Sequence, residues 1–153
     1  MDYGCGSGIL ACAALKFGAA AAVGTDVDTL AVEVSGRNAA RNGVADRFAA
    51  YRCEPRSDDA EPLAAAGLPK GQVDHAFDVT VANILKGPVL DLAERLAGYT
   101  KRGTGRVILS GILVTQAPEV VAKYSRWFDD VAVDSEGEWA LVTGRRRDTD
   151  LAL

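Results

Sequence analysis

The run "DYGCGSG" at residues 2–8 constrains the fold more than any other feature, because it holds three glycines at alternate positions. Gly4, Gly6 and Gly8 can adopt backbone conformations that are strained for other residues, and they let a ligand approach where a Cβ would obstruct it. A loop of this kind joins a buried strand to a helix. Residues 9–17, rich in Ala and Leu, predict that helix. The run therefore predicts a ligand site in an α/β fold.

Strand-like and helix-like segments alternate along the rest of the chain, without an internal repeat. We expect strands at 21–26, 48–53, 77–82 and 106–110, and helices at 28–42, 86–99 and 115–125. Residues 54–72 carry no sustained period and predict a long surface loop. Residues 128–133 and 139–143 predict a closing hairpin. The predicted fold is a mostly parallel sheet with helices on both faces and an antiparallel hairpin at its end.

Composition excludes several classes of protein. With 153 residues, 48% of them hydrophobic and 25% charged, the chain fits one soluble domain with a substantial core. Its net charge of −4 argues against a nucleic-acid-binding surface, and we interpret the run Arg145 to Arg147 as a solvated chain end. The apolar stretches are shorter than the roughly 20 residues of a membrane span. We expect a protein that is neither secreted nor membrane-bound.

The cysteines indicate neither a disulfide framework nor a metal site. Cys5, Cys12 and Cys53 are odd in number and form no CxxC pair. Reduced thiols in a cytosol-like compartment fit this pattern, and we predict no bound metal. Four other side chains that can attract a functional interpretation are expected to be structural: His75 at the surface, and Tyr124, Trp127 and Trp139 in the core.

Asp26 strengthens the ligand prediction. It ends the second predicted strand, where a carboxylate can accept hydrogen bonds from both ribose hydroxyls of an adenosine-containing ligand. The spacing GxGxG differs from the GxGxxG of dinucleotide sites, and Asp2 places a carboxylate where a pyrophosphate would lie. A sulfonium ligand with an ammonium group tolerates that carboxylate. These residues favour S-adenosyl-L-methionine, and a nicotinamide-dependent dehydrogenase stays open as an alternative.

Several segments together resemble a known family. They are "DYGCGSGILACAALKFGA", "VGTDVD", "VANIL", "RVILSGIL" and "EWALVTGRR". In this order they resemble the catalytic domain of the PrmA family, which methylates protein eleven of the large ribosomal subunit. They also resemble the related mitochondrial enzyme that methylates lysines of the electron-transfer flavoprotein beta subunit. The resemblance implies a class I S-adenosyl-L-methionine-dependent methyltransferase, Rossmann-like, with a catalytic domain at residues 1–147 and a tail at 148–153. A lysine or another amine of a protein is the implied acceptor.

The resemblance also assigns site residues. It places the methionine end of the cofactor against Gly4 and its neighbours, and the ribose at Asp26. The implied cofactor contacts are Asp2, Gly4, Cys5, Gly6, Gly8, Asp26 and Asn83. Asn83 is also the implied catalytic residue, because its amide oxygen can accept a hydrogen bond from the incoming amine. Related amine methyltransferases often have prolines after this asparagine, but Ile84 and Leu85 follow here, so the motif leaves the acceptor type open.

Members of the family carry further sequence before the first strand, whereas only Met1 to Tyr3 precede the glycines here. We therefore expect the first strand to be largely missing, and reduced stability and activity as a result. A remnant that binds cofactor or partner without turnover is the second hypothesis. The expected partner is a protein substrate rather than nucleic acid or membrane, in the cytoplasm or an organelle such as the mitochondrion or chloroplast.

Overall fold

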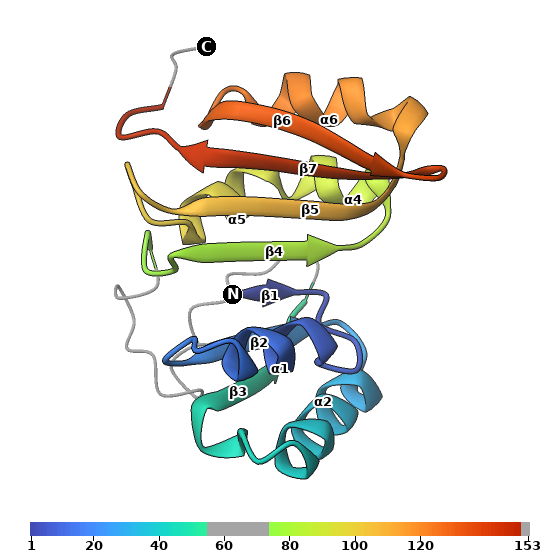
Figure 1. Cartoon of the computed structure of the whole chain (residues 1–153), viewed down its shortest axis with the longest axis vertical. Helices are drawn as coiled ribbons and strands as arrows, with labels where there is room; N and C mark the ends of the chain where they lie inside the picture. Colours follow the sequence, from blue (N-terminus) through green and yellow to red (C-terminus); the bar gives the residue numbers. More distant parts are fainter. Residues whose placement is uncertain (55–73, 151–153) are drawn as a thin grey trace. The chain divides into compact units, whose positions relative to one another are not determined.

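The computed structural model of the chain describes residues 1–54 and 74–150. The chain divides into two compact units, Met1–Val73 and Asp74–Leu153 (Figure 1). Most of the surface loop predicted at 54–72 lies outside the described residues, as do the last three residues of the predicted tail. Within the described ranges, no helix has the length and apolar character needed to cross a bilayer.

Unit 1 is built from parallel strands and two helices. Its elements are β1 (Asp2–Tyr3), α1 (Ile9–Lys16), β2 (Ala22–Asp26), α2 (Thr29–Arg41), a 3₁₀ turn (Ala45–Arg47) and β3 (Phe48–Arg52). The strand order is β3-β2-β1, and both pairings are parallel. Strand β1 has two residues, with Asp2 opposite Gly24 and Tyr3 opposite Thr25. The carboxyl ends of β1 and β2 therefore lie side by side.

Local chemistry explains where the helices of unit 1 begin and what they bury. The side chain of Asp28 accepts a hydrogen bond of 2.9 Å from the backbone N–H of Leu30, so Asp28 is the N-cap of α2, as predicted. Helix α1 buries Ala11, Cys12 and Leu15, which lie on one side of the helix at spacings of one, three and four residues. This buried face fixes how α1 leaves the glycine run.

Unit 2 combines one parallel pairing with an antiparallel hairpin. Its elements are β4 (Val79–Asn83), α4 (Lys86–Asp91), α5 (Ala93–Tyr99), β5 (Arg106–Leu113), a 3₁₀ turn (Val114–Gln116), α6 (Ala117–Tyr124), β6 (Phe128–Glu136) and β7 (Trp139–Arg146). The strand order is β4-β5-β7-β6, with β4 and β5 parallel and the other two pairings antiparallel. The predicted α/β fold with mostly parallel strands and a terminal hairpin is confirmed.

Two predicted helices differ in detail. The segment predicted as one helix at 86–99 forms two, because Leu92 lies between α4 and α5 with a backbone that leaves the helical region. The helix predicted from residue 115 begins at Ala117, after a 3₁₀ turn, and Pro118 occupies its first turn. Proline fits this position because the first N–H groups of a helix have no partner within it.

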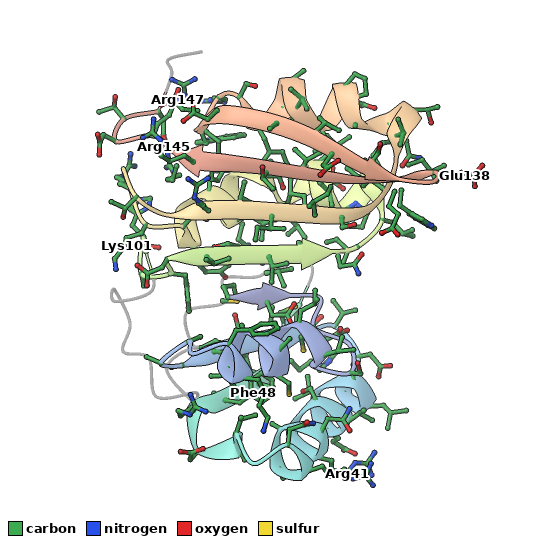
Figure 2. The ribbon with its side chains drawn as sticks, viewed as in Figure 1. Arg41, Phe48, Lys101, Glu138, Arg145 and Arg147 are labelled. Carbon is green, nitrogen blue, oxygen red and sulfur yellow. The ribbon has the colours of Figure 1, made fainter. Side chains whose placement is uncertain are left out.

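The hairpin corrects two predictions about burial. Trp139 was expected in the core but its side chain is 56% exposed, whereas Trp127 and Tyr124 are buried as predicted. Arg146, in the run expected to be solvated, is only 1% exposed, although Arg145 and Arg147 project from the end of β7 (Figure 2). The physical reason is the two-residue period of β7, which turns its even-numbered side chains inward.

Candidate functional site

The glycine loop, residues 4–8 of unit 1, joins β1 to α1 and is held by backbone hydrogen bonds. The N–H groups of Gly4 and Cys5 both donate to the carbonyl oxygen of Thr25, at 2.8 Å each. The N–H of Gly8 donates to the carbonyl oxygen of Cys5 at 2.7 Å. The φ angles of Gly4, Gly6 and Gly8 are 75°, 51° and 76°, in the left-handed region. The shape of this turn therefore requires glycine at alternate positions.

Gly6 and Gly8 differ in what surrounds them. A Cβ built on Gly8 would lie 2.8 Å from the Cβ of Ser35, which is fully buried on α2. A Cβ built on Gly6 would meet no atom of residues 1–54 and 74–150 within 4 Å. The backbone at Gly6 is therefore open to a ligand, whereas the absent side chain of Gly8 allows α1 and α2 to pack closely.

Asp26 lies directly against the glycine loop, at the carboxyl end of β2. Its Oδ2 accepts a hydrogen bond of 2.9 Å from the N–H of Gly6, and its Oδ1 accepts one of 3.0 Å from the N–H of Asp28. Each carboxylate oxygen can accept a second hydrogen bond. The carboxylate is thus fixed in orientation and keeps two acceptor positions beside the open face of Gly6.

Asp2 lies in β1, and its buried carboxylate contacts the first turn of α1. It is 3% exposed, and its Oδ2 accepts a hydrogen bond of 3.1 Å from the N–H of Ala11. Burial raises the pKa of Asp2; the Ala11 N–H and the positive N-terminus of the chain oppose this shift, and the negative charge of Asp26 reinforces it. The ionised form is therefore under-compensated in this structure, and a cation placed nearby would relieve it.

Cys5 is a structural thiol. Its side chain is 5% exposed, and a Cβ built on Gly24 of β2 would lie 3.0 Å from its sulfur. Burial, with a further contribution from the charge of Asp2, raises the pKa of Cys5 to about 12. The thiol therefore stays protonated at neutral pH and is not a nucleophile. Cys5, Cys12 and Cys53 are all buried and free, and the described residues contain no cluster of metal-binding side chains.

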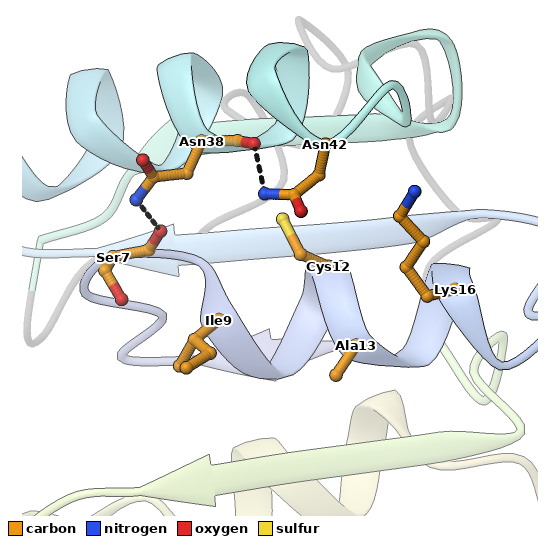
Figure 3. Close-up of a pocket in the computed structure, with 7 residues that line it drawn as sticks. All are labelled: Ser7, Ile9, Cys12, Ala13, Lys16, Asn38 and Asn42. Atoms are coloured by element: carbon orange, nitrogen blue, oxygen red, sulfur yellow. Dashed lines mark hydrogen bonds between the residues drawn. The ribbon is translucent and has the colours of Figure 1, made fainter.

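A groove of about 400 Å³ runs between α1 and α2 (Figure 3). It is lined by Ser7, Ile9, Cys12, Ala13, Lys16, Asn38 and Asn42. The side chain of Asn38 donates to the carbonyl oxygen of Ser7 at 2.9 Å, and Asn42 donates to that of Asn38 at 2.8 Å. Neither Asp2 nor Asp26 lines this groove. It is a feature of the helix pair, and Asn38 ties the glycine loop to α2.

Asn83, the predicted catalytic residue, belongs to unit 2. It is the last residue of β4 and is exposed, directly opposite Ser110 in β5. Its side-chain oxygen lies close to Gly111, on which a built Cβ would stand 2.8 Å from the Asn83 Oδ1. Sequence reasoning missed Gly111, although "SGIL" was part of the resemblance. The signal that could have revealed it was a glycine next to a polar residue at the end of a predicted strand.

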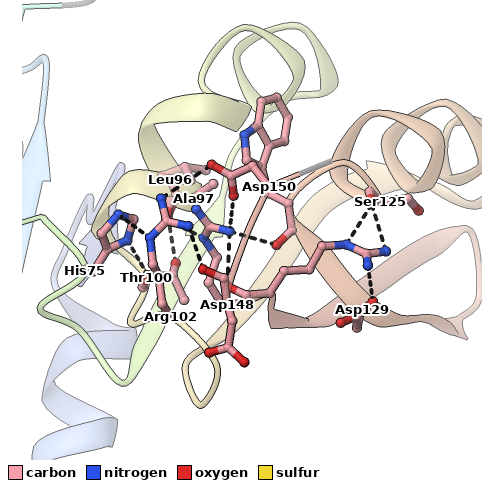
Figure 4. A network of polar contacts seen from close by, with 12 residues as sticks. His75, Leu96, Ala97, Thr100, Arg102, Ser125, Asp129, Asp148 and Asp150 are labelled. Carbon is pink, nitrogen blue, oxygen red and sulfur yellow. Dashed lines mark hydrogen bonds and ion pairs between the residues drawn. The ribbon is translucent and has the colours of Figure 1, made fainter. Parts of the chain in front are cut away.

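His75 takes part in a network of polar contacts in unit 2 (Figure 4). Its Nδ1 lies 3.0 Å from the carbonyl oxygen of Thr100, and the Nε of Arg102 donates to its Nε2 at 3.1 Å. An Nε2 that accepts leaves the ring proton on Nδ1, which then donates to Thr100. His75 is half-buried, and both of its ring nitrogens contact other groups of the protein. Its role is therefore structural.

The strand order and the glycine loop define the class of fold. A solved RNA methyltransferase from Salinibacter ruber, in complex with S-adenosyl-L-homocysteine, matches with a TM-score of 0.67 and 19% identity. The match covers 97% of this chain and 80% of that one. The fold is that of the class I S-adenosyl-L-methionine-dependent methyltransferases, as predicted.

Sequence similarity narrows the class to one family. Residues 1–147 match the family model described as ribosomal protein L11 methyltransferase (PrmA), and the chain belongs to this family. The L11 methyltransferase of Neisseria meningitidis serogroup C is 46% identical over 147 residues, which are 96% of this chain and 43% of that protein. A solved L11 methylase from Lactobacillus delbrueckii subsp. bulgaricus is 34% identical, with a TM-score of 0.71, over 95% of this chain and 68% of that one. The chain spans less than half the length of the Neisseria protein.

Proposed function

We propose that the chain binds S-adenosyl-L-methionine at the glycine loop and Asp26, and that it transfers a methyl group to an amine of ribosomal protein L11. One observation carries the cofactor part of the proposal. An open glycine backbone at Gly6 lies hydrogen-bonded to a carboxylate with spare acceptor positions. The names of the Neisseria and Lactobacillus relatives support the acceptor.

The residues of unit 1 fit this cofactor. The two remaining acceptor positions of Asp26 suit a pair of ribose hydroxyls, and Gly6 leaves room for the ligand beside them. The under-compensated charge of Asp2 suits the ammonium group of the cofactor's methionine end. A nicotinamide dinucleotide would instead bring a pyrophosphate toward Asp2, whose negative charge is already disfavoured by burial and by the charge of Asp26. This electrostatic difference disfavours the dehydrogenase alternative.

Asn83 is the residue that we propose for the acceptor amine. When bound, S-adenosyl-L-methionine supplies an activated methyl group on a sulfonium. The amide oxygen of Asn83 accepts a hydrogen bond from one N–H of a neutral amine and so orients its lone pair. An amide remains neutral over the whole working range of pH, and it can orient the amine without removing its proton. Lysine side chains and a terminal α-amine both fit this role.

The proposed acceptor is ribosomal protein L11 rather than the electron-transfer flavoprotein beta subunit, because both relatives described above are named for L11. Lysine is the acceptor residue that we propose first. A compartment that contains ribosomes follows from this substrate, and the cytoplasm or an organelle satisfies that condition. Residues 1–147 carry the catalytic domain in this proposal.

Calorimetric titration of S-adenosylhomocysteine into the chain tests the cofactor site. We expect Asp26→Asn to weaken binding by about tenfold or more, since it loses a charged acceptor for the ribose. Asp28→Asn is the matched control, because asparagine is an equally good N-cap and Asp28 touches no proposed ligand. Equal affinities in both variants would reject the Asp26 assignment. NAD that binds more tightly than S-adenosylhomocysteine would revive the dehydrogenase.

Methyl transfer is tested by incubating the chain with S-adenosyl-L-methionine and purified L11, followed by peptide mass spectrometry. A mass gain on a lysine or on the α-amine of L11, lost in Asn83→Ala, supports the whole proposal. Cofactor binding without transfer would instead favour the non-catalytic remnant. Transfer that persists in Asn83→Ala would reject the role of Asn83 and leave the function intact.

A further inference from the structure

Strand β5 contains an irregularity next to Asn83. Its pairing with β7 shifts register between Leu109 and Ile112, and Gly111 within this bulge has a φ of 74°. On its other side β5 pairs with β4, where Ser110 lies opposite Asn83. The bulge therefore presents the Gly111 backbone to the end of β4.

The approach between Gly111 and the end of β4 is too close for a side chain. A Cβ at Gly111 would lie 2.7 Å from the carbonyl oxygen of Ile84, 2.9 Å from its nitrogen and 2.8 Å from the Oδ1 of Asn83. A carbon atom does not come this close to an oxygen or nitrogen to which it is not bonded. Two of these three atoms belong to the backbone. Any side chain at position 111 would displace both the Asn83 amide and the peptide that follows it.

The bulge is fixed from its far side. The hydroxyl of Ser110 donates to the carbonyl oxygen of Ala140 in β7 at 3.2 Å, and the N–H of Val114 donates to the carbonyl oxygen of Glu138 at 2.9 Å. These contacts hold the bulge against the hairpin. The bulge that faces Asn83 is thus held in place by the hairpin.

We propose that Gly111 is a positioning residue for Asn83, and that its missing side chain and left-handed backbone hold the Asn83 amide where the acceptor amine is oriented. The inference rests on the role proposed above for Asn83. It adds a second residue of the "SGIL" segment to the machinery of transfer, acting through Asn83 rather than on substrate. A misplacement on the order of 1 Å in such a group can cost about a hundredfold in rate.

Gly111→Ala and Gly137→Ala form a matched pair for the test. Gly137, in the turn between β6 and β7, has a φ of 59°, and a built Cβ there meets no atom within 4 Å in the described part of the chain. Both variants therefore carry the strain of a left-handed alanine, but only Gly111→Ala collides with Asn83. We expect kcat for methyl transfer to fall about tenfold or more in Gly111→Ala with KM for S-adenosyl-L-methionine unchanged. Gly137→Ala should keep both values.

A second readout does not depend on activity. The side-chain amide signals of Asn83 in a nitrogen-correlated NMR spectrum, assigned by their loss in Asn83→Ala, should move in Gly111→Ala and stay in place in Gly137→Ala. Ser110→Ala is the second variant for this measurement, to be used if Gly111→Ala does not fold. It adds no atoms and removes the hydroxyl that holds the bulge, so it should move the same signals and lower kcat several-fold.

The outcomes separate this inference from the proposed function. Asn83 signals that move no more in Gly111→Ala and Ser110→Ala than in Gly137→Ala would overturn the positioning role, whatever the activity. Moved signals with an unchanged kcat would overturn its relevance to transfer. A wild-type chain that transfers no methyl group would count against the proposed function alone, because the NMR comparison still reports whether Gly111 sets the place of Asn83.

Discussion

The glycine loop of unit 1 and the network around Arg146 in unit 2 both gather charged side chains around backbone groups, but they use these groups differently. In the network, the guanidinium of Arg146 donates to the carbonyl oxygens of Ala97 and Trp127, at 2.9 and 3.1 Å, and to the carboxylate of Asp150. Arg102 also contacts Asp150 (Figure 4). Most of the hydrogen-bond donors and acceptors in this network are paired with other groups of the protein.

The glycine loop, by contrast, keeps hydrogen-bond acceptor positions available to a ligand. Asp26 accepts one N–H on each oxygen and can accept two more, while Gly6 beside it has open space where a side chain would be. The buried carboxylate of Asp2 accepts a hydrogen bond from the N–H of Ala11. A saturated cluster stabilises a fold, whereas a fixed but unsaturated one is suited to a ligand. Free acceptor positions therefore distinguish the candidate binding site from the structural network.

The largest effect that we expect concerns Gly6 and Gly8, two of the three glycines of the loop. Gly8→Ala forces a Cβ against Ser35 and keeps a left-handed alanine, so the free energy of unfolding should fall by about 2–4 kcal/mol. Gly6→Ala carries only the backbone strain and should cost about 1 kcal/mol, but it should weaken S-adenosylhomocysteine binding. Urea unfolding and calorimetry measure the two quantities. Similar stability losses in both variants would contradict this division of roles.

Arg146→Met should come next. It removes a buried guanidinium from two carbonyl oxygens and a carboxylate, and the free energy of unfolding should fall by roughly 2–3 kcal/mol. Arg145→Met is the control: this side chain is 38% exposed, so its ion pairs with Asp129 and Asp130 should contribute less than about 1 kcal/mol. The affinity for S-adenosylhomocysteine should not change in either folded variant. A loss of affinity in Arg146→Met would break the contrast between the two regions.

Asp2→Asn should separate stability from binding. Because burial raises the pKa of Asp2, its ionised form destabilises the folded protein, and stability falls as the pH rises through the raised pKa. Asparagine keeps an acceptor for the N–H of Ala11 and removes the charge. The variant should be more stable near neutral pH by about 1 kcal/mol and should bind S-adenosylhomocysteine several-fold more weakly. Unfolding measured across pH, with calorimetry, checks both; lower stability would refute the account of Asp2.

The smallest expected effect is the acid response of Asp150. A hydrogen bond from Arg146 is the main cause that holds the pKa of Asp150 below its ordinary value of 3.8. Its contribution to stability is therefore fully present above that value and is lost as the pH falls through the lowered pKa. The carboxylate is about a third exposed, so the contribution should stay below about 1 kcal/mol. When the pH is lowered, the thermal unfolding midpoint of Asp150→Asn should fall by less than the midpoint of the wild type.

The sequence predicted most elements of the fold, and it assigned Asp26 and the glycine loop to one candidate site. Strands β2 and β3 and helices α1 and α2 lie within a residue or two of their predicted positions, because their signals are local: an N-cap at Asp28, or a glycine after a helix. The structure joins Asp26 and Gly6, which the sequence assigned to the same ligand, by a hydrogen bond. The burial of Trp139 and Arg146 was predicted wrongly, because which face of β7 is covered depends on residues distant in the chain.

The sequence alone determined the class of fold and the turn between β1 and α1, because hydrophobic period and glycine spacing act over a few residues. Tertiary structure alone decided that Gly8 serves helix packing while Gly6 is open, that Arg146 is buried, and that Gly111 lies against Asn83. Each of these facts depends on contacts between elements far apart in the sequence. Such contacts follow from how helices and strands pack, and a residue's chemical type does not reveal which neighbour it will meet.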